Sequence, residues 1–201
     1  MKLSIIIKTG IFLFTLSVDL INAQTYPCPI NGNAESNSFT NWTTYTSQAE
    51  NPQQLNGFAP NFDAGRFGVH DGISNYPQGQ NGSDIYGDFP VPSEGTYFFR
   101  VGNDLSGAQA EAMRYTFTVT PENKNFKLRY ALVLEDGGHS LGENPAAWFY
   151  FVKGATMTPS FNNLSLWSNT ITSFVADLSN PFYKKSPNVN SVVYRPWECI
   201  E

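Results

Sequence analysis

Apolar and polar residues alternate along several short segments of the chain, with the period of two that is typical of half-buried β-strands. The clearest case is 114–120, where Tyr115, Phe117 and Val119 fall on one face and polar residues on the other. Further strands are predicted at 66–69, 96–101, 126–134, 146–152 and 192–197. The segment 146–152 is apolar on both faces, which favours a central strand.

The segments between these strands predict turns and loops. Thr120-Pro121-Glu122-Asn123 carries residues that favour a tight reversal, so a hairpin is expected between 114–120 and 126–134. The stretch 47–95 is rich in Gly, Pro and Asn, and such a length predicts binding loops or poor order. Residues 171–178 have helical spacing but fit a strand equally well.

Strands at this spacing, without amphipathic helices between them, indicate two antiparallel sheets packed face to face. The prediction is an all-β, antiparallel β-sandwich forming one domain over 24–201. Composition agrees, because the chain has 16 Phe, 16 Gly and 13 Pro, and only 14% charged residues. With 12 Lys and Arg and a net charge of -5, nucleic acid is not an expected partner.

The first 23 residues are typical of a secretory signal peptide. Lys2 and Lys8 are followed by the largely apolar stretch 9–18, and Ala23 is the small residue expected before a cleavage site. Asp19 ends the apolar stretch well short of the roughly 20 residues that cross a bilayer. We therefore expect export to the exterior or the cell surface, cleavage after Ala23, and no membrane span in the remaining chain.

Both cysteines, Cys28 and Cys199, lie in the part that is expected to be exported. Export permits a disulfide between them, and a loop of this length would stabilise the fold by roughly 4 to 5 kcal/mol. Two unpaired thiols are the alternative, because spacing alone does not bring the two residues together.

Two parts of the chain resemble known families. Residues 30–35 and 39–43, Ile-Asn-Gly-Asn-Ala-Glu and Phe-Thr-Asn-Trp-Thr, resemble the opening of galactose-binding-like jelly-roll modules. Residues 99–104, 107–111, 115–123 and 133–140 resemble the N-terminal β-sandwich domain of surface proteins from bacteria with type IX secretion and gliding motility. The likeness covers about 28–153 and the Tyr-Arg-Pro-Trp segment 194–197. It implies a jelly roll whose last strands, and further modules, follow beyond Glu201.

The resemblance also implies a structural Ca²⁺ site. Glu35 stands at the position of the carboxylate that binds calcium in the jelly-roll modules, and a last-strand partner would lie beyond Glu201. Glu35 as a solvated or turn-capping carboxylate is the alternative. Glu135 and Asp136 form a second, weaker candidate for a cation or an acid/base pair, although adjacent strand residues point to opposite sides.

Catalysis has no positive support in the sequence. The two histidines, His70 and His139, are too few for a His-rich metal site, and no serine lies in Gly-x-Ser-x-Gly. We therefore expect a protein that is not an enzyme.

Aromatic residues beside amides are the candidates for glycan binding, because sugar C–H groups stack on rings while amides bind hydroxyls. The candidates are Trp42, Tyr76 and Tyr86 with Asn75 and Gln78, and the two loop tyrosines are expected to be exposed. The leading function is a secreted, non-catalytic, adhesin-like module that binds a glycan. A fragment of a polysaccharide-active hydrolase and a purely structural spacer are the alternatives.

Overall fold

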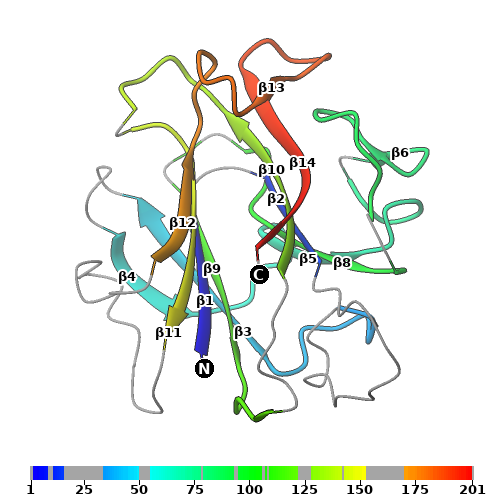
Figure 1. Cartoon of the computed structure of the whole chain (residues 1–201), viewed down its shortest axis with the longest axis vertical. Coiled ribbons are helices and arrows are strands. Elements are labelled where there is room, and N and C mark those ends of the chain that lie inside the picture. Colours follow the sequence, from blue (N-terminus) through cyan, green and yellow to red (C-terminus); the bar gives the residue numbers. More distant parts are fainter. Residues whose placement is uncertain are drawn as a thin grey trace.

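The computed structural model describes residues 2–8, 11–15, 34–49, 55–77, 79–92, 95–105, 107, 109–121, 128–141, 143–152 and 170–200. Within these ranges the strands form two six-stranded sheets and one two-stranded ribbon, and every neighbouring pair is antiparallel. Figure 1 shows the first sheet on the left and the second on the right.

The first sheet, called sheet A, has the order β12 (Thr170–Val175), β11 (Ala146–Val152), β1 (Lys2–Lys8), β9 (Gln109–Thr116), β3 (Trp42–Ala49) and β4 (Leu55–Pro60). The second, called sheet B, has the order β13 (Lys184–Lys185), β14 (Val192–Ile200), β10 (Leu128–Glu135), β2 (Ile11–Thr15), β8 (Phe98–Val101) and β5 (Phe67–His70). The ribbon pairs β6 (Gly79–Gln80) with β7 (Ser83–Asp84).

The main core lies between the two sheets. Alternate residues of β9 in sheet A and of β10 in sheet B contribute to one buried cluster, as period-two geometry requires. Aromatic rings join the sheets: the centroids of Tyr130 and Phe149 are 5.0 Å apart, and those of Trp42 and Phe99 are also 5.0 Å apart. The predicted all-β, antiparallel sandwich is confirmed, whereas the jelly-roll assignment stays a prediction.

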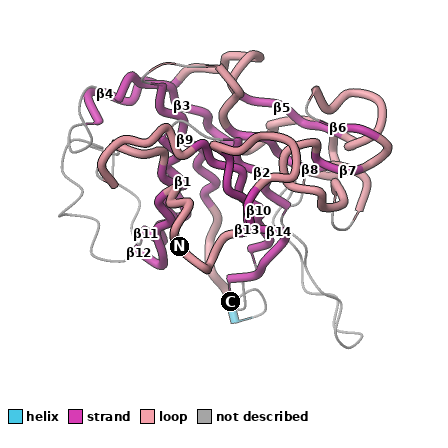
Figure 2. Tube along the Cα trace, turned by 90° about the horizontal axis from the view of Figure 1, so that it is seen from above, coloured by secondary structure: helices cyan, strands magenta, loops and turns pink. Residues whose placement is uncertain are grey.

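A second core covers the outer face of sheet B. Residues 71–92 leave the sheet after β5 and return before β8, and the ribbon of β6 and β7 lies within them. Figure 2 shows this ribbon on the side of sheet B that faces away from sheet A. Here Tyr76, Phe89 and Val91 pack against Ala131 and Val133, which alternate with the residues of β10 that face the main core. The outer face of sheet B is therefore buried and largely apolar, with His70 and Arg100 as buried polar residues on it.

The strands at the N-terminus hold central positions. β1 pairs with β11 on one side and β9 on the other, and β2 pairs with β10 and β8. Both strands fall within the 23 residues that the sequence predicts to be a signal peptide. The predicted leader therefore contributes two inner strands to the fold, while its cleavage stays a prediction.

The expected hairpin around Thr120 to Asn123 is wrong. β9 ends at Thr116 in sheet A, and β10 begins at Leu128 in sheet B, so the connection crosses from one sheet to the other. The physical reason is that Tyr115 and Leu128 bury their side chains in the same core from opposite sheets.

Three other segments differ from their predicted structure. The stretch 47–95 contains β4 to β7 as well as loops. The ambiguous segment 171–178 is a strand as far as Val175 and then enters a turn. The strand expected over 192–197 continues to Ile200.

Among the described residues, no helix has both the length and the apolar composition needed to span a membrane.

Candidate functional site

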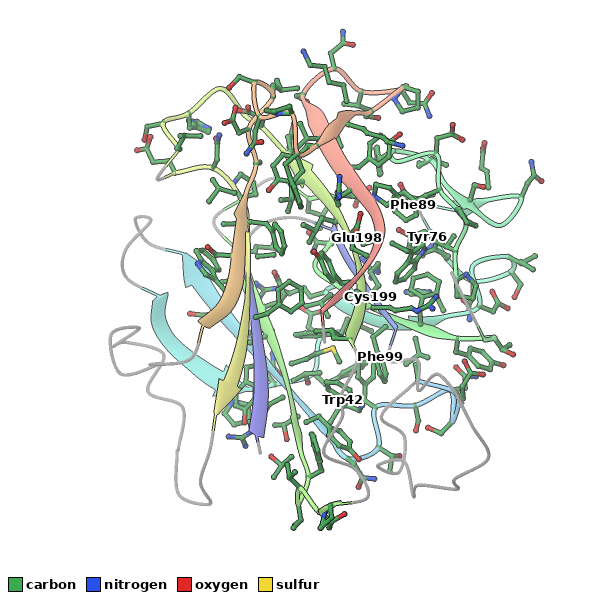
Figure 3. The ribbon with its side chains drawn as sticks, viewed as in Figure 1. Trp42, Tyr76, Phe89, Phe99, Glu198 and Cys199 are labelled. Atoms are coloured by element: carbon green, nitrogen blue, oxygen red, sulfur yellow. The ribbon has the colours of Figure 1, made fainter. Side chains whose placement is uncertain are left out.

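Tyr76 is a buried residue, so the expectation of an exposed ring is wrong. Its side chain is 5% exposed, and its ring meets Phe98 edge to face at a centroid distance of 5.1 Å. The hydroxyl donates a hydrogen bond of 2.6 Å to Oδ2 of Asp84. Figure 3 shows Tyr76 and Phe89 beside β14, on the side away from sheet A. Burial next to Asp84 holds the pKa of Tyr76 well above its ordinary value.

Asp84 organises the turn that follows it. Its carboxylate is 2% exposed, and Oδ1 accepts hydrogen bonds of 2.8 Å from the amides of Tyr86 and Gly87. Burial raises the pKa of Asp84, while the hydrogen bonds from Tyr76, Gly87 and Tyr86 lower it. This carboxylate therefore has a structural partner for each of its oxygens.

Tyr86 extends from this turn to the surface. It is partly buried, and its hydroxyl donates to Oδ2 of the exposed Asp104 at 3.4 Å. Burial raises the pKa of Tyr86, and the carboxylates of Asp104 and Glu135 add to the rise. Of the three aromatic residues that the sequence singles out, Tyr86 is the one that reaches solvent, and it does so beside acidic groups.

Trp42 belongs to the main core. It is 7% exposed and packs on Phe99 and Tyr115, with ring centroids 5.0 Å away from each. A ring held in this way has little surface left for a sugar. Trp42 lies in the main core, whereas Tyr86 packs against the second core, so the structure does not bring the two rings together.

Of the two amide residues predicted beside the tyrosines, Asn75 and Gln78, the structure describes only Asn75. Asn75 is exposed, but its side-chain oxygen accepts a hydrogen bond from the amide of Asp71 at 2.9 Å, and its backbone oxygen contacts Nδ1 of His70 at 2.7 Å. Gln78 lies outside the described residues. Asn75 therefore has a role in closing the loop 71–75, and a ligand would have to compete for its oxygen atoms.

Glu35 joins two distant segments. Its Oε1 accepts hydrogen bonds from the amides of Thr96 at 3.0 Å and Tyr97 at 3.1 Å. Gly95 precedes them with φ near 71°, and a Cβ at that position would overlap the Glu35 carboxylate. Both features explain why a carboxylate and a glycine occupy these positions without invoking a metal.

Asp136 is likewise held by the fold. It accepts hydrogen bonds from the amide of Leu178 at 2.8 Å, from that of Gly138 at 3.0 Å and from Nδ2 of Asn144 at 3.1 Å. The Leu178 amide is the main cause that lowers the pKa of Asp136 below its ordinary value. Glu135 is exposed and accepts a hydrogen bond of 3.1 Å from the hydroxyl of Ser191. The two side chains therefore accept hydrogen bonds from different segments.

No cluster of three or more His, Cys, Asp and Glu side chains suited to a metal ion occurs among the described residues. The carboxylates of Glu35 and Asp136 already accept backbone hydrogen bonds, with which a calcium ion would have to compete. The described residues therefore show no preformed calcium site. Calcium binding stays a prediction, and a comparison of the melting temperature in Ca²⁺ and in chelator tests it.

Cys199 is exposed near the end of β14 and has no disulfide partner among the described residues. Cys28 lies outside them, so the predicted disulfide stays a prediction.

A buried ion pair that the sequence did not predict lies at one end of the main core. Nε of Arg66 donates to Oε1 of Glu111 at 2.5 Å, and Glu111 is 1% exposed. Its Oε2 is buried without a hydrogen-bond partner in the described part of the chain, and burial raises the pKa of Glu111 to about 7. The alternation of Glu111, Met113 and Tyr115 was the available signal, because it puts the carboxylate on the apolar face of β9.

Comparisons with family models, curated proteins and solved structures found no match to this chain. The resemblance to surface proteins of type IX secretion therefore stays a prediction, and the fold class rests on the structure itself.

Proposed function

We propose that this chain is a secreted, non-catalytic β-sandwich module of an adhesin-like surface protein, and that it binds a glycan through the loops beside sheet B. The observation that carries the proposal is the position of Tyr86, a partly exposed ring that hydrogen-bonds to the exposed carboxylate of Asp104. A ring next to hydrogen-bond acceptors is the combination that sugar recognition uses.

The turn that carries Tyr86 is held from two sides. Asp84 accepts hydrogen bonds from the amides of Tyr86 and Gly87, and the side-chain amide of Asn188 donates to the backbone oxygen of Ile85. Because the turn is anchored to a buried carboxylate and to the segment before β14, the ring is presented in a defined place. Such preorganisation reduces the entropic cost of binding.

Acidic side chains next to the ring favour a neutral, hydroxyl-rich ligand. The Tyr86 hydroxyl donates to Asp104, and the carboxylates of Asp104, Asp84 and Glu135 all raise the pKa of Tyr86. Carboxylates accept hydrogen bonds from sugar hydroxyls but repel an anionic polymer, in keeping with the net charge of -5.

A glycan array and retention on insoluble polysaccharide test the proposal. Retention without release of sugar is expected, and Tyr86→Ala should weaken binding by about tenfold or more because the stacking surface is lost. Tyr86→Phe keeps the ring and should have a smaller effect. Leu141→Ala is the control, because Leu141 is exposed on another loop and should leave retention unchanged.

Other results would favour the alternatives. Release of sugar that Glu135→Gln abolishes would support the hydrolase fragment instead. A protein that shows neither retention nor turnover would support the structural spacer.

Export is a separate part of the proposal. Intact mass measurement of the protein from its natural host should show a mature N-terminus at Gln24. A protein that begins at Met1 would contradict cleavage after Ala23 but would leave the glycan site untouched.

A further inference from the structure

The segment predicted to be a leader contributes one strand to each sheet, and each of these strands lies between two others. All seven residues of β1 align with residues of β11 on one side and of β9 on the other. Ile5 is opposite Phe149 and Met113, whose side chains are fully buried in the main core. β1 is therefore positioned against the centre of the core.

β2 has the equivalent position in sheet B. Its register places Phe12 opposite Leu132 and Val101, and Phe14 opposite Tyr130 and Phe99. All four of these neighbours belong to the main core. The continuous apolar run in 11–15, Ile-Phe-Leu-Phe-Thr, suits a strand between two others.

Removal of these strands would open both sheets. Sheet A would be divided into β12–β11 and β9–β3–β4, and sheet B into β13–β14–β10 and β8–β5. Four strands that are paired on both sides would then become edges with unsatisfied N–H and C=O groups.

The two openings have no simple way to close. β9 and β11 both run antiparallel to β1, so they are parallel to each other, and the same holds for β8 and β10 around β2. Direct pairing would need a parallel ladder with a different hydrogen-bond pattern. It would also need a movement of about 4.8 Å, the spacing of one strand, across a packed core.

We propose that each sheet carries a strand-acceptor slot, filled by β1 (Lys2–Lys8) in sheet A and by β2 (Ile11–Thr15) in sheet B. Loss of these two strands creates a binding site for an extended peptide of alternating apolar residues. The ligand would add one strand antiparallel to β9 and β11 and a second antiparallel to β8 and β10. Main-chain hydrogen bonds supply affinity in this mode, and the alternate side chains supply specificity. The inference rests on the proposed cleavage but not on glycan binding.

The first test uses the full chain with a protease recognition sequence inserted after Ala23. After folding and cutting, the N-terminal fragment should stay with the body during native size-exclusion chromatography and separate only in denaturant. Backbone amides of β9 and β11 should remain protected from hydrogen exchange until the fragment leaves. Separation of the two parts in native buffer would overturn the proposal.

The second test adds the N-terminal segment back as a separate peptide. After the fragment is removed in denaturant and the body is returned to native buffer, a labelled peptide of residues 2–15 should bind with a stoichiometry of 1:1. A peptide with Ile5→Pro should bind at least about tenfold more weakly, because proline removes a ladder N–H and is excluded from central strands. The control is Ile5→Val, which keeps the ladder and should bind like the parent.

Self-association gives a further outcome. If the body alone forms oligomers that the 2–15 peptide dissolves, the slots accept strands, as proposed. Oligomers that the peptide leaves unchanged, or binding equal for the Ile5→Pro peptide, would overturn the proposal. Glycan retention measured on the same uncut protein is independent of these results, so failure of the two proposals is distinguishable.

Discussion

The two faces of sheet B, one in the main core and one under residues 71–92, are both buried, although the second also holds the polar residues His70 and Arg100. Phe99 faces the main core, and its neighbour Phe98 faces the second core, yet each side chain is 0% exposed. The difference between them lies in what covers them: a regular sheet on one side and a loop excursion with a short ribbon on the other. Burial in this protein therefore does not require a second sheet.

One buried carboxylate in each core can also be compared by the hydrogen-bond partners of its two oxygens. Asp84 in the second core has hydrogen-bond partners on both oxygens, whereas Glu111 at the end of the main core has Arg66 on one oxygen and no hydrogen-bond partner among the described residues on the other. An unsatisfied buried oxygen is costly when it is charged. Of these two carboxylates, Asp84 is thus the better satisfied.

The largest expected effect comes from truncating the two neighbouring phenylalanines. Phe99→Ala should lower the free energy of unfolding by about 4 kcal/mol and Phe98→Ala by about 3 kcal/mol, since both leave cavities in packed surroundings. Urea denaturation checks both values. Ile73→Ala, at a residue that is 80% exposed, should stay within about 0.5 kcal/mol. A similarly small loss for Phe98→Ala would mean that the loops do not form a true core.

A smaller effect is expected from the titration of Glu111. Its pKa is about 7 in the folded chain, above the ordinary value of 4.5, so the folded state holds a proton that the unfolded state releases. The stabilisation is fully present below about pH 4.5 and is lost as the pH rises through about 7, by at most about 3 kcal/mol.

Glu111→Gln should remove this part of the pH dependence, measured as the difference in unfolding free energy from wild type across pH 4.5 to 8. Burial lowers the pKa of His70, so His70 contributes stability that is lost as the pH falls, with the opposite sign. The contribution of His70 is present in both wild type and variant, so it cancels in the difference between their unfolding free energies. Parallel pH profiles for wild type and variant would contradict the assignment to Glu111.

The smallest expected effect concerns the hydrogen bond of the second core. Tyr76→Phe keeps the packed ring but removes the donor to Asp84, which should cost about 1 to 2 kcal/mol because a buried carboxylate oxygen loses its partner. Thermal unfolding at neutral pH measures the loss. Tyr86→Phe is the matched control, because its hydrogen bond to Asp104 is exposed and long at 3.4 Å. Equal losses for both variants would remove the distinction between the two tyrosines.

Alternation along the chain located six of the fourteen described strands, β5, β8, β9, β10, β11 and β14, but not their partners. It located β11 at 146–152 and most of β10 and β14, because side-chain period is a local property of the backbone. It gave no information on whether consecutive strands share a sheet, so β9 and β10 were wrongly joined as a hairpin. Pairing depends on long-range contacts that no local pattern contains.

The candidate site shows the same contrast between local features, which the sequence predicts, and long-range contacts, which it does not. Loop composition suggested that both Tyr76 and Tyr86 are exposed, and only Tyr86 is near solvent, since the fold of 71–92 turns Tyr76 onto Phe98. Glu35 and Asp136 were candidate metal ligands in the sequence, with turn-capping as the alternative for Glu35, but their hydrogen-bond partners, Thr96 and Leu178, are distant in sequence. A turn-capping role needs those partners to be known.

By itself the sequence determined the all-β class and the positions of six of the fourteen described strands, because residue type and period act over a few neighbouring residues. Only the tertiary structure decided which strands pair, that the outer face of sheet B is covered, and that 2–8 and 11–15 occupy the middle of the two sheets. These features arise from contacts between residues far apart in the chain, where packing and backbone hydrogen bonding are satisfied together or not at all.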